Sequence, residues 1–263
     1  MLSPGALRGA SGGLDPRILG AGGVFVTGTG TGVGKTVVAA ALARTLQRVG
    51  LAVAAMKPAQ TGTGEGADDL AFIRAAGGVS ASRCVAPYAL RRPLAPSVAA
   101  RMEGATLEPG RIVDDFRRLS GEAHVVVVEG AGGLLVPFSD STDMADLATA
   151  LGIPLLVVAL PGLGTLNHIA LTVEAARTRG LEVAGVVLCG FPAGPGLPGL
   201  AEATNPGAIG ELAGVVPHLA GLDVDRGIVP PAFEPEPWLV PRLGGSFEVA
   251  AFLRLLSQCG ELV

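Results

Sequence analysis

The sequence predicts an α/β fold, a three-layer arrangement in which helices cover both faces of a mostly parallel β-sheet. Short β-branched runs alternate along the chain with stretches of helical periodicity, which is typical of parallel strands joined by crossover helices. The runs are apolar at consecutive positions, as strands covered on both faces require. A glycine-rich turn follows the first run and leads into a Lys-Thr pair, which predicts a strand, a phosphate-binding loop and a helix.

Five stretches have the composition of buried strands, and helical stretches separate them. The predicted strands are Val24–Thr27, Ala52–Met56, Val125–Glu129, Leu155–Ala159 and Val183–Leu188, with a further candidate at Val215–Val216. The predicted helices lie near 35–49, 68–77, 110–120, 143–151, 165–180 and 199–213, and a last one lies near Ser246–Gln258.

Length and composition favour one compact domain. The chain has 263 residues, of which 49% are hydrophobic, and we expect a single domain over residues 23–263. Residues 1–22 are rich in Gly, Ala and Ser without periodicity, so we expect a flexible extension there. The net charge is −4 and Lys and Arg never cluster beyond a dipeptide, so neither nucleic acid nor an anionic membrane surface is an expected partner.

Cysteine usage and hydropathy favour a cytoplasmic protein. Cys84, Cys189 and Cys259 are far apart and form no C-x-x-C pair, which favours reduced thiols over a disulfide framework or a metal site. Apolar runs such as Leu155–Leu160 are shorter than the roughly 18 residues that a membrane helix needs. The start of the chain lacks an apolar signal core.

The glycine-rich turn is a phosphate loop that runs Gly28-Thr29-Gly30-Thr31-Gly32-Val33-Gly34-Lys35-Thr36. Glycines let backbone N–H groups close around phosphate oxygens, Lys35 can reach the outer phosphates, and the hydroxyl of Thr36 can ligate Mg²⁺. The loop therefore predicts a nucleoside triphosphate as ligand and a P-loop NTPase fold. Its spacing is a variant, because five residues separate Gly28 from Gly34 where the common pattern has four.

Two further polar segments follow predicted strands, where ligands of parallel sheets bind. After the second strand comes Lys57-Pro58-Ala59-Gln60-Thr61-Gly62, with Asp68-Asp69 beyond it. Lys57 can project into the phosphate crevice, or it can be a solvated lysine at the sheet edge. After the third strand comes Glu129-Gly130-Ala131-Gly132-Gly133, in which Glu129 can serve Mg²⁺ or be a buried, paired structural residue.

Together with Leu163-Gly164-Thr165-Leu166-Asn167-His168, these motifs resemble the dethiobiotin synthetase family in an ordered match over about residues 23–220. The variant spacing of the phosphate loop is itself a feature of that family. The resemblance implies a Mg²⁺-dependent ligase of biotin biosynthesis that uses ATP to close the ureido ring of dethiobiotin from 7,8-diaminononanoate and CO₂. It also implies a homodimer with the substrate site at the interface.

The resemblance also implies roles for individual residues. Lys35 and Lys57 would be catalytic, holding phosphate and the developing carbamate. The implied substrate contacts are Thr31, Thr61, Gly164, Thr165, Leu166 and Asn167. The implied metal ligands are Thr36, Glu129 and one of Asp68 and Asp69, and we expect both aspartates near the metal. The implied nucleotide contacts are Gly32, Val33, Gly34, Lys35, Thr36, Val37, Asp69, Glu129, Gly130, Ala131, Gly132, Cys189, Gly190 and Pro217.

One position departs from the family. After the fifth strand the family often carries Asn-Asp to read the adenine edge, whereas this chain has Cys189-Gly190, which cannot reproduce that pattern of donors and acceptors. We therefore expect weak discrimination between ATP and other triphosphates.

Other classes fit the motifs less well. A partitioning-type switch ATPase needs a lysine near the start of the loop, where this chain has Thr29 and Gly30. A cobyrinate-type amidotransferase needs a glutaminase domain, for which too little chain remains after residue 220. A non-catalytic nucleotide-binding module remains an alternative, and it predicts no ATP hydrolysis that depends on diaminononanoate.

The helix predicted after the fourth strand offers a site for a carboxylate. A helix start has unpaired N–H groups and partial positive charge, and no Lys or Arg lies between Leu155 and Glu174 to supply another positive group. The alternative is an ordinary capped helix. In dethiobiotin synthetases this segment meets the substrate tail across a two-fold interface, and the resemblance implies the same here.

Overall fold

The protein is described here by a computed structural model in which residues 22–191, 199–212 and 218–223 are placed. Within these residues seven strands form one parallel sheet in the order β4-β2-β6-β1-β7-β8-β9, and β3 pairs with β5 in a separate small sheet. The strands are β1 (Gly23–Gly28), β2 (Val53–Met56), β3 (Ala59–Gln60), β4 (Cys84–Val85), β5 (Tyr88–Ala89), β6 (Val125–Glu129), β7 (Leu155–Ala159), β8 (Val183–Phe191) and β9 (His218–Asp223).

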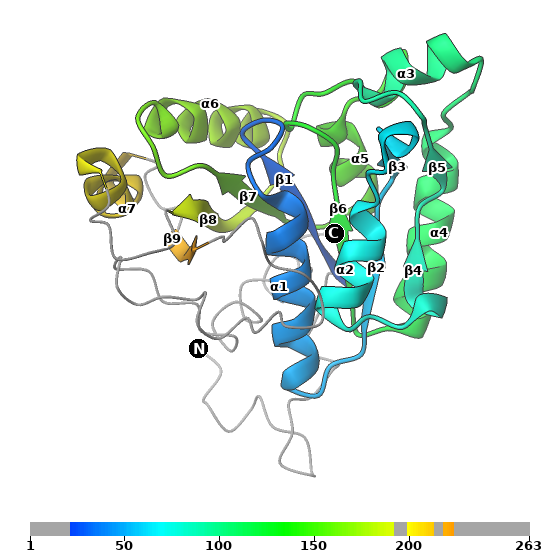
Figure 1. Ribbon diagram of the computed structural model, residues 1–263, viewed down its shortest axis with the longest axis horizontal. Coiled ribbons are helices and arrows are strands. Elements are labelled where there is room, and N and C mark those ends of the chain that lie inside the picture. Colours follow the sequence, from blue (N-terminus) through cyan, green and yellow to red (C-terminus); the bar gives the residue numbers. More distant parts are fainter. Residues whose placement is uncertain (1–21, 192–198, 213–217, 224–263) are drawn as a thin grey trace.

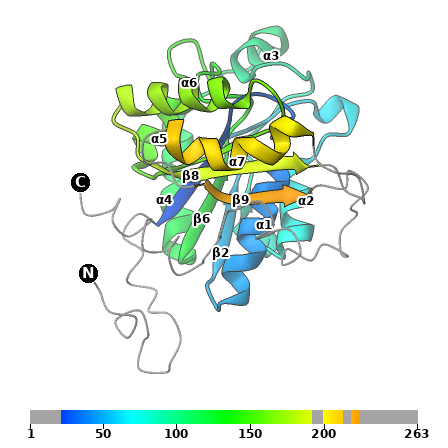
Figure 2. The same ribbon diagram turned by 90° about the vertical axis from the view of Figure 1, so that its left-hand side faces the viewer.

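Helices cover both faces of this sheet (Figures 1 and 2). The helices are α1 (Lys35–Arg48), α2 (Asp69–Gly77), α3 (Pro96–Glu103), α4 (Pro109–Glu122), α5 (Met144–Leu151), α6 (Thr165–Thr178) and α7 (Leu200–Leu212). The first two pack on one face, and α4 to α7 pack on the other. In Figure 2 the sheet lies between α1 and α2 on one side and α5, α6 and α7 on the other.

The two cores follow from the alternation of side chains along each strand. In β1, Val24 and Val26 belong to the core under α1, whereas Phe25 belongs to the core under α4 and α5. All six residues of β1 and all five of β6 are buried, which explains why both strands are apolar at consecutive positions.

The predicted fold class is confirmed, and the predicted elements recur with small shifts at their ends. Val125–Glu129 and Leu155–Ala159 match β6 and β7. Helix α3 and the two-residue strands β3, β4 and β5 were not predicted from the sequence. Val215–Val216, the helix predicted near 246–258 and nearly all of the extension 1–22 lie outside the described residues, although β9 begins at His218. No described helix is long and apolar enough to cross a membrane.

Parallel pairing brings the functional segments to one edge of the sheet. The carboxyl ends of β1, β2, β6 and β7 lie at the same edge because each strand runs parallel to its neighbours. The phosphate loop leaves β1 there and leads into α1 (Figure 1). Lys57 follows β2 directly, Glu129 ends β6, and the turn before α6 follows β7.

Candidate active site

The phosphate loop has the tight backbone that its glycines predict. Gly34 caps α1 at φ 95°, in the left-handed region, and a Cβ there would overlap the Sγ of Cys189. Lys35 is only 7% exposed, and its Nζ donates a hydrogen bond across the loop to the carbonyl of Gly30 at 2.9 Å. The ammonium of Lys35 is thus held inside the loop, where the phosphates of a nucleotide would lie.

Lys57 links two carboxylates next to this loop. Its Nζ lies 2.7 Å from Oε1 of Glu129 and 2.6 Å from Oδ2 of Asp69. Glu129 also accepts a hydrogen bond from the hydroxyl of Thr36 at 2.9 Å. The three strand ends and the start of α2 therefore bring together Lys35, Thr36, Lys57, Asp69 and Glu129, which we call the lysine–carboxylate cluster.

Burial and neighbouring charges set the protonation of this cluster. Burial lowers the pKa of Lys35 to about 8, although Glu129 and Asp69 oppose that shift. Burial also disfavours the charged form of Lys57, but the charges of Glu129 and Asp69 and their hydrogen bonds outweigh it and raise its pKa. Burial raises the pKa of Glu129, and Lys57 and Thr36 counteract that rise. Lys57 therefore stays cationic across the physiological range.

The donor set suits Mg²⁺ that is shared with phosphate groups. Oε2 of Glu129 is buried without a hydrogen-bond partner, whereas Oε1 of the same carboxylate accepts the hydrogen bond from Thr36. Mg²⁺ is commonly held by one or two carboxylates together with phosphates and water. No group of three or more His, Cys, Asp or Glu in the described part of the chain forms a self-contained metal site. A cation at this position would therefore depend on the nucleotide for further ligands.

The glycine turn after β6 packs against the phosphate loop. A Cβ on Gly130 would meet the ring of Phe25 at 2.8 Å, and Gly132 has φ 67°. A Cβ on Gly133 would lie 3.4 Å from the carbonyl oxygen of Gly28. Small residues here let the turn approach the phosphate loop closely.

Cys189 lies inside β8 rather than after it, because the strand extends to Phe191. The thiol is buried, donates to the carbonyl of Gly34 at 3.9 Å, and has a pKa raised to about 12 by burial. The side chain of Cys189 therefore packs against the phosphate loop at Gly34. Gly190 is exposed, and Pro217 lies outside the described residues.

The chain is similar in sequence to known proteins. A family model described as an AAA domain matches residues 22–232. An ATP-dependent dethiobiotin synthetase BioD from Anaeromyxobacter dehalogenans (strain 2CP-C) is 54% identical over 168 residues, which are 63% of this chain and 75% of the relative. A protein of the same name from Parafrankia sp. (strain EAN1pec) is 44% identical over 236 residues, 88% of this chain and 97% of the relative. The chain belongs to the dethiobiotin synthetase family.

Solved structures resemble the chain in fold. The cell division ATPase MinD from Pyrococcus furiosus aligns with a TM-score of 0.52 and 20% identity, over 92% of this chain and all of that one. MinD from Pyrococcus horikoshii OT3 aligns with a TM-score of 0.51 and 18% identity, over 89% of this chain and 93% of that one. The P-loop NTPase fold is therefore confirmed.

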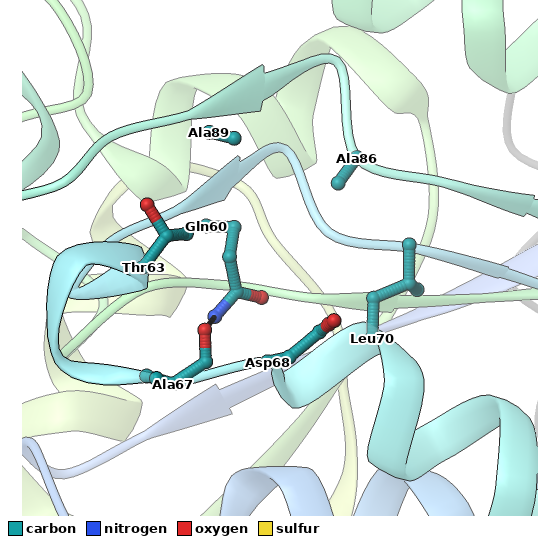
Figure 3. Close-up of a pocket in the computed structure, with 8 residues that line it drawn as sticks. Gln60, Thr63, Ala67, Asp68, Leu70, Ala86 and Ala89 are labelled. Carbon is teal, nitrogen blue, oxygen red and sulfur yellow. Dashed lines mark hydrogen bonds between the residues drawn. The ribbon is translucent and has the colours of Figure 1, made fainter.

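The two aspartates expected near the metal in dethiobiotin synthetases take different positions here. Asp69 contacts Lys57, whereas Asp68 caps α2 by accepting a hydrogen bond from the amide of Ala71 at 2.8 Å. Asp68 also lines a hollow of about 460 Å³ between the β3–β5 sheet and the start of α2 (Figure 3). Of the two, Asp69 is the one that lies in the lysine–carboxylate cluster.

The residues that the family resemblance assigns to the substrate fall into two groups. Thr31 is exposed on the phosphate loop and Thr61 is half-buried just after β3. Gly164 caps α6 at φ 92°, and Thr165 is buried beneath it. Leu166 is half-buried and Asn167 exposed on the first turn of that helix.

Two buried polar residues were not singled out by their sequence. Gln60 donates through Nε2 to the carbonyl of Ala67 at 3.3 Å (Figure 3) and so fixes the loop that precedes Asp68 and Asp69. Asn205 on α7 donates to the turn before α6. Asn205 lies in a stretch without a motif, and Gln60 lies within the segment 57–62, but the backbone partner of either amide has no signal in one sequence.

Proposed function

We propose that the chain is an ATP-dependent dethiobiotin synthetase, a carbon–nitrogen ligase that joins 7,8-diaminononanoate and CO₂ into the ureido ring of dethiobiotin. ATP is the co-substrate and is converted to ADP and phosphate. The lysine–carboxylate cluster beside the phosphate loop carries this proposal, in a chain that belongs to the family. Two lysines, and a carboxylate pair that can hold Mg²⁺, suit a reaction in which carbamate and phosphoryl oxygens carry negative charge.

The reaction needs three bond-forming steps and no covalent enzyme intermediate. One amine of the substrate attacks CO₂ and loses a proton, which gives a carbamate. A carbamate oxygen then attacks the γ-phosphorus of ATP, ADP leaves, and a carbamic–phosphoric anhydride results. The second amine attacks the carbonyl carbon of this anhydride, phosphate leaves and the amine loses a proton, which closes the ring. Catalysis is then mainly positioning and neutralisation of charge.

The two lysines differ in their surroundings, and this supports different roles. Lys35 is held by the carbonyl of Gly30 inside the loop, so we assign it to the phosphates of the bound nucleotide. Lys57 reaches in from β2 with a pKa raised by its two carboxylates, so it would approach the site fully charged. We assign Lys57 to the place where carbamate and γ-phosphate meet.

Mg²⁺ would be held by Thr36, Asp69 and Glu129 together with the phosphates, and Asp68 caps the helix that presents Asp69. The unpartnered Oε2 of Glu129 supports this assignment, because a buried carboxylate oxygen without a partner is costly unless a cation or donor joins it. When bound, Mg²⁺ would neutralise charge on the transferring phosphoryl group.

We also propose a homodimer in which each site borrows the turn before α6 from its partner. Leu163, next to Gly164 in this turn, is 96% exposed, which suits a contact that a second chain completes. Because Gly164 has φ 92°, Gly164→Val should strain the turn and weaken diaminononanoate binding while nucleotide binding stays nearly intact.

Mixed dimers test this arrangement. Heterodimers of Gly164→Val with Lys57→Ala should regain activity that neither homodimer has, since one of the two sites then combines an intact Lys57 with an intact turn. No regained activity in verified heterodimers would place both groups in the site of one subunit.

We further propose a cytoplasmic location, because Cys84 and Cys189 are both free thiols and the implied substrates are small soluble metabolites.

Phosphate release tests the proposed function as a whole. With ATP, Mg²⁺, bicarbonate and 7,8-diaminononanoate present, phosphate should appear at a steady rate, and omission of any one component should stop it. Phosphate release that does not respond to diaminononanoate would instead favour a nucleotide hydrolase or a binding module.

A further inference from the structure

Asn205 on α7 makes two hydrogen bonds to the turn that precedes α6. It is only 6% exposed, and its Nδ2 donates to the carbonyl of Pro161 at 2.7 Å and to that of Gly162 at 3.1 Å. The two helices also share a small core, in which Ile209 of α7 packs with Ile169 and Val173 of α6. The amide is therefore fixed at a buried junction between the two helices.

These two carbonyls lie directly before the residues that start α6. The carbonyl of Gly162 also accepts the amide of Thr165 at 3.2 Å, so that both lone pairs of this oxygen have donors. The carbonyl of Gly162 is therefore fixed from two sides, by Asn205 of α7 and by the first residue of α6.

The first turn of α6 has donors of its own to offer. The amides of Leu166 and Asn167 belong to the first turn, where the backbone N–H groups have no acceptor within the helix. Their use as an anion site requires the turn 161–164 to hold one conformation, whereas a glycine such as Gly164 can adopt several. The two hydrogen bonds from Asn205 restrict the turn from outside.

We propose that Asn205 is a positioning residue that holds the turn 161–164 so that the first turn of α6 can bind the carboxylate of the substrate. This rests on the proposed function, in which the turn before α6 contributes to the site for 7,8-diaminononanoate. Both donated hydrogen bonds come from one amide nitrogen, so Asp, which has the same shape but no N–H, would turn two attractions into repulsions.

Two substrates and two variants separate positioning from general stability. Asn205→Asp and Asn205→Ala should raise the KM for 7,8-diaminononanoate by about tenfold, the effect of about 1.4 kcal/mol. The KM for ATP and the kcat should stay within about twofold. The diamine 2,3-diaminononane, in which a methyl group replaces the carboxylate, should bind wild type and variants equally weakly. A merely structural role for Asn205 would weaken the binding of both compounds alike.

Thr204→Val is the matched control. Thr204 is exposed on the same helix and its hydroxyl donates only within α7, to the carbonyls of Leu200 at 2.8 Å and Ala201 at 3.5 Å, so its loss should leave both KM values unchanged. If Asn205→Asp does not fold, amide hydrogen exchange is measured in Asn205→Ala. Exchange at residues 162–166 should be faster in this variant than in wild type.

The outcomes can be told apart. An unchanged KM for diaminononanoate in a folded Asn205 variant, or unchanged exchange at 162–166, would overturn the positioning role. A wild-type protein that does not turn over diaminononanoate would contradict the proposed function instead.

Discussion

Replacing Lys57 by Met tests whether the charge of this lysine holds the lysine–carboxylate cluster together. Met keeps an unbranched stem but removes the ammonium that contacts Glu129 at 2.7 Å and Asp69 at 2.6 Å. Glu129 is 1% exposed and would retain only the hydroxyl of Thr36 as a partner. Breaking a buried pair in this way costs roughly 3–5 kcal/mol. The pair with Asp69, whose side chain is 36% exposed, adds under about 1 kcal/mol.

Urea unfolding at pH 7 should therefore show a loss of roughly 3–5 kcal/mol in the free energy of unfolding. The loss should shrink as the pH falls toward 5. Burial already raises the pKa of Glu129 above its usual 4.5, and removal of Lys57 raises it further. A carboxyl group with a higher pKa in the folded state binds more protons there, so the stability of the variant rises as the pH falls through that pKa.

The double variant Lys57→Met/Glu129→Gln is the control, because it removes both members of the buried pair and should recover much of the loss. Loss of less than about 1 kcal/mol in Lys57→Met, or an equal loss at pH 7 and pH 5, would refute this reasoning. In activity assays Lys57→Met should bind ATP nearly as wild type does but fail to turn over, whereas Lys35→Ala should lose nucleotide affinity as well.

Three further predictions concern the metal, the proton on Lys35 and the phosphate loop. Glu129→Gln should raise the Mg²⁺ concentration needed for half-maximal activity, because the amide keeps the shape and loses the charge; an unchanged titration would assign Glu129 to structure. Burial lowers the pKa of Lys35 to about 8, so nucleotide affinity measured by calorimetry should fall by up to about tenfold per pH unit above that value, and Lys35→Met should show no such fall. Gly34→Ala should lower the free energy of unfolding by roughly 2–5 kcal/mol, the sum of its left-handed φ and the overlap with Cys189. The additional change Cys189→Gly should relieve only the overlap, and full recovery of stability would contradict the contribution from φ.

The sequence predicted the strands that are buried on both faces, because these strands are apolar at consecutive positions. Val125–Val128 are apolar on both faces because α1 packs on one side and α4 on the other, so the run itself identifies β6. The two-residue strands β3 and β5 have no such signal, since they are fixed by pairing with each other. Helix α3 begins at Pro96, a favourable first position, but its buried residues are Pro96, Ser97, Ala99 and Ala100, so its buried face lacks the large apolar side chains that mark the equally short α5.

For the site, the sequence predicted which strand ends carry polar side chains but not which of these side chains touch. Lys57 and Glu129 are 72 positions apart, and only the adjacency of β2 and β6 brings them to 2.7 Å. Neighbouring aspartates cannot be told apart by composition, whereas the helix start gives the cap to Asp68 and the contact with Lys57 to Asp69. The role of Asn205 could not be predicted from the sequence. Its partners are backbone carbonyls more than 40 positions away, and every residue type has such a carbonyl.

The central claim is that the lysine–carboxylate cluster makes a ureido ring from a diamine, CO₂ and ATP. Its most direct test uses ¹³C-labelled bicarbonate with 7,8-diaminononanoate, ATP and Mg²⁺, followed by mass spectrometry of the product. We predict dethiobiotin with the label at the ureido carbonyl carbon, formed together with equal amounts of ADP and phosphate, and none from Lys57→Met. Phosphate release without labelled dethiobiotin in the wild type, or normal labelling by Lys57→Met, would contradict the account.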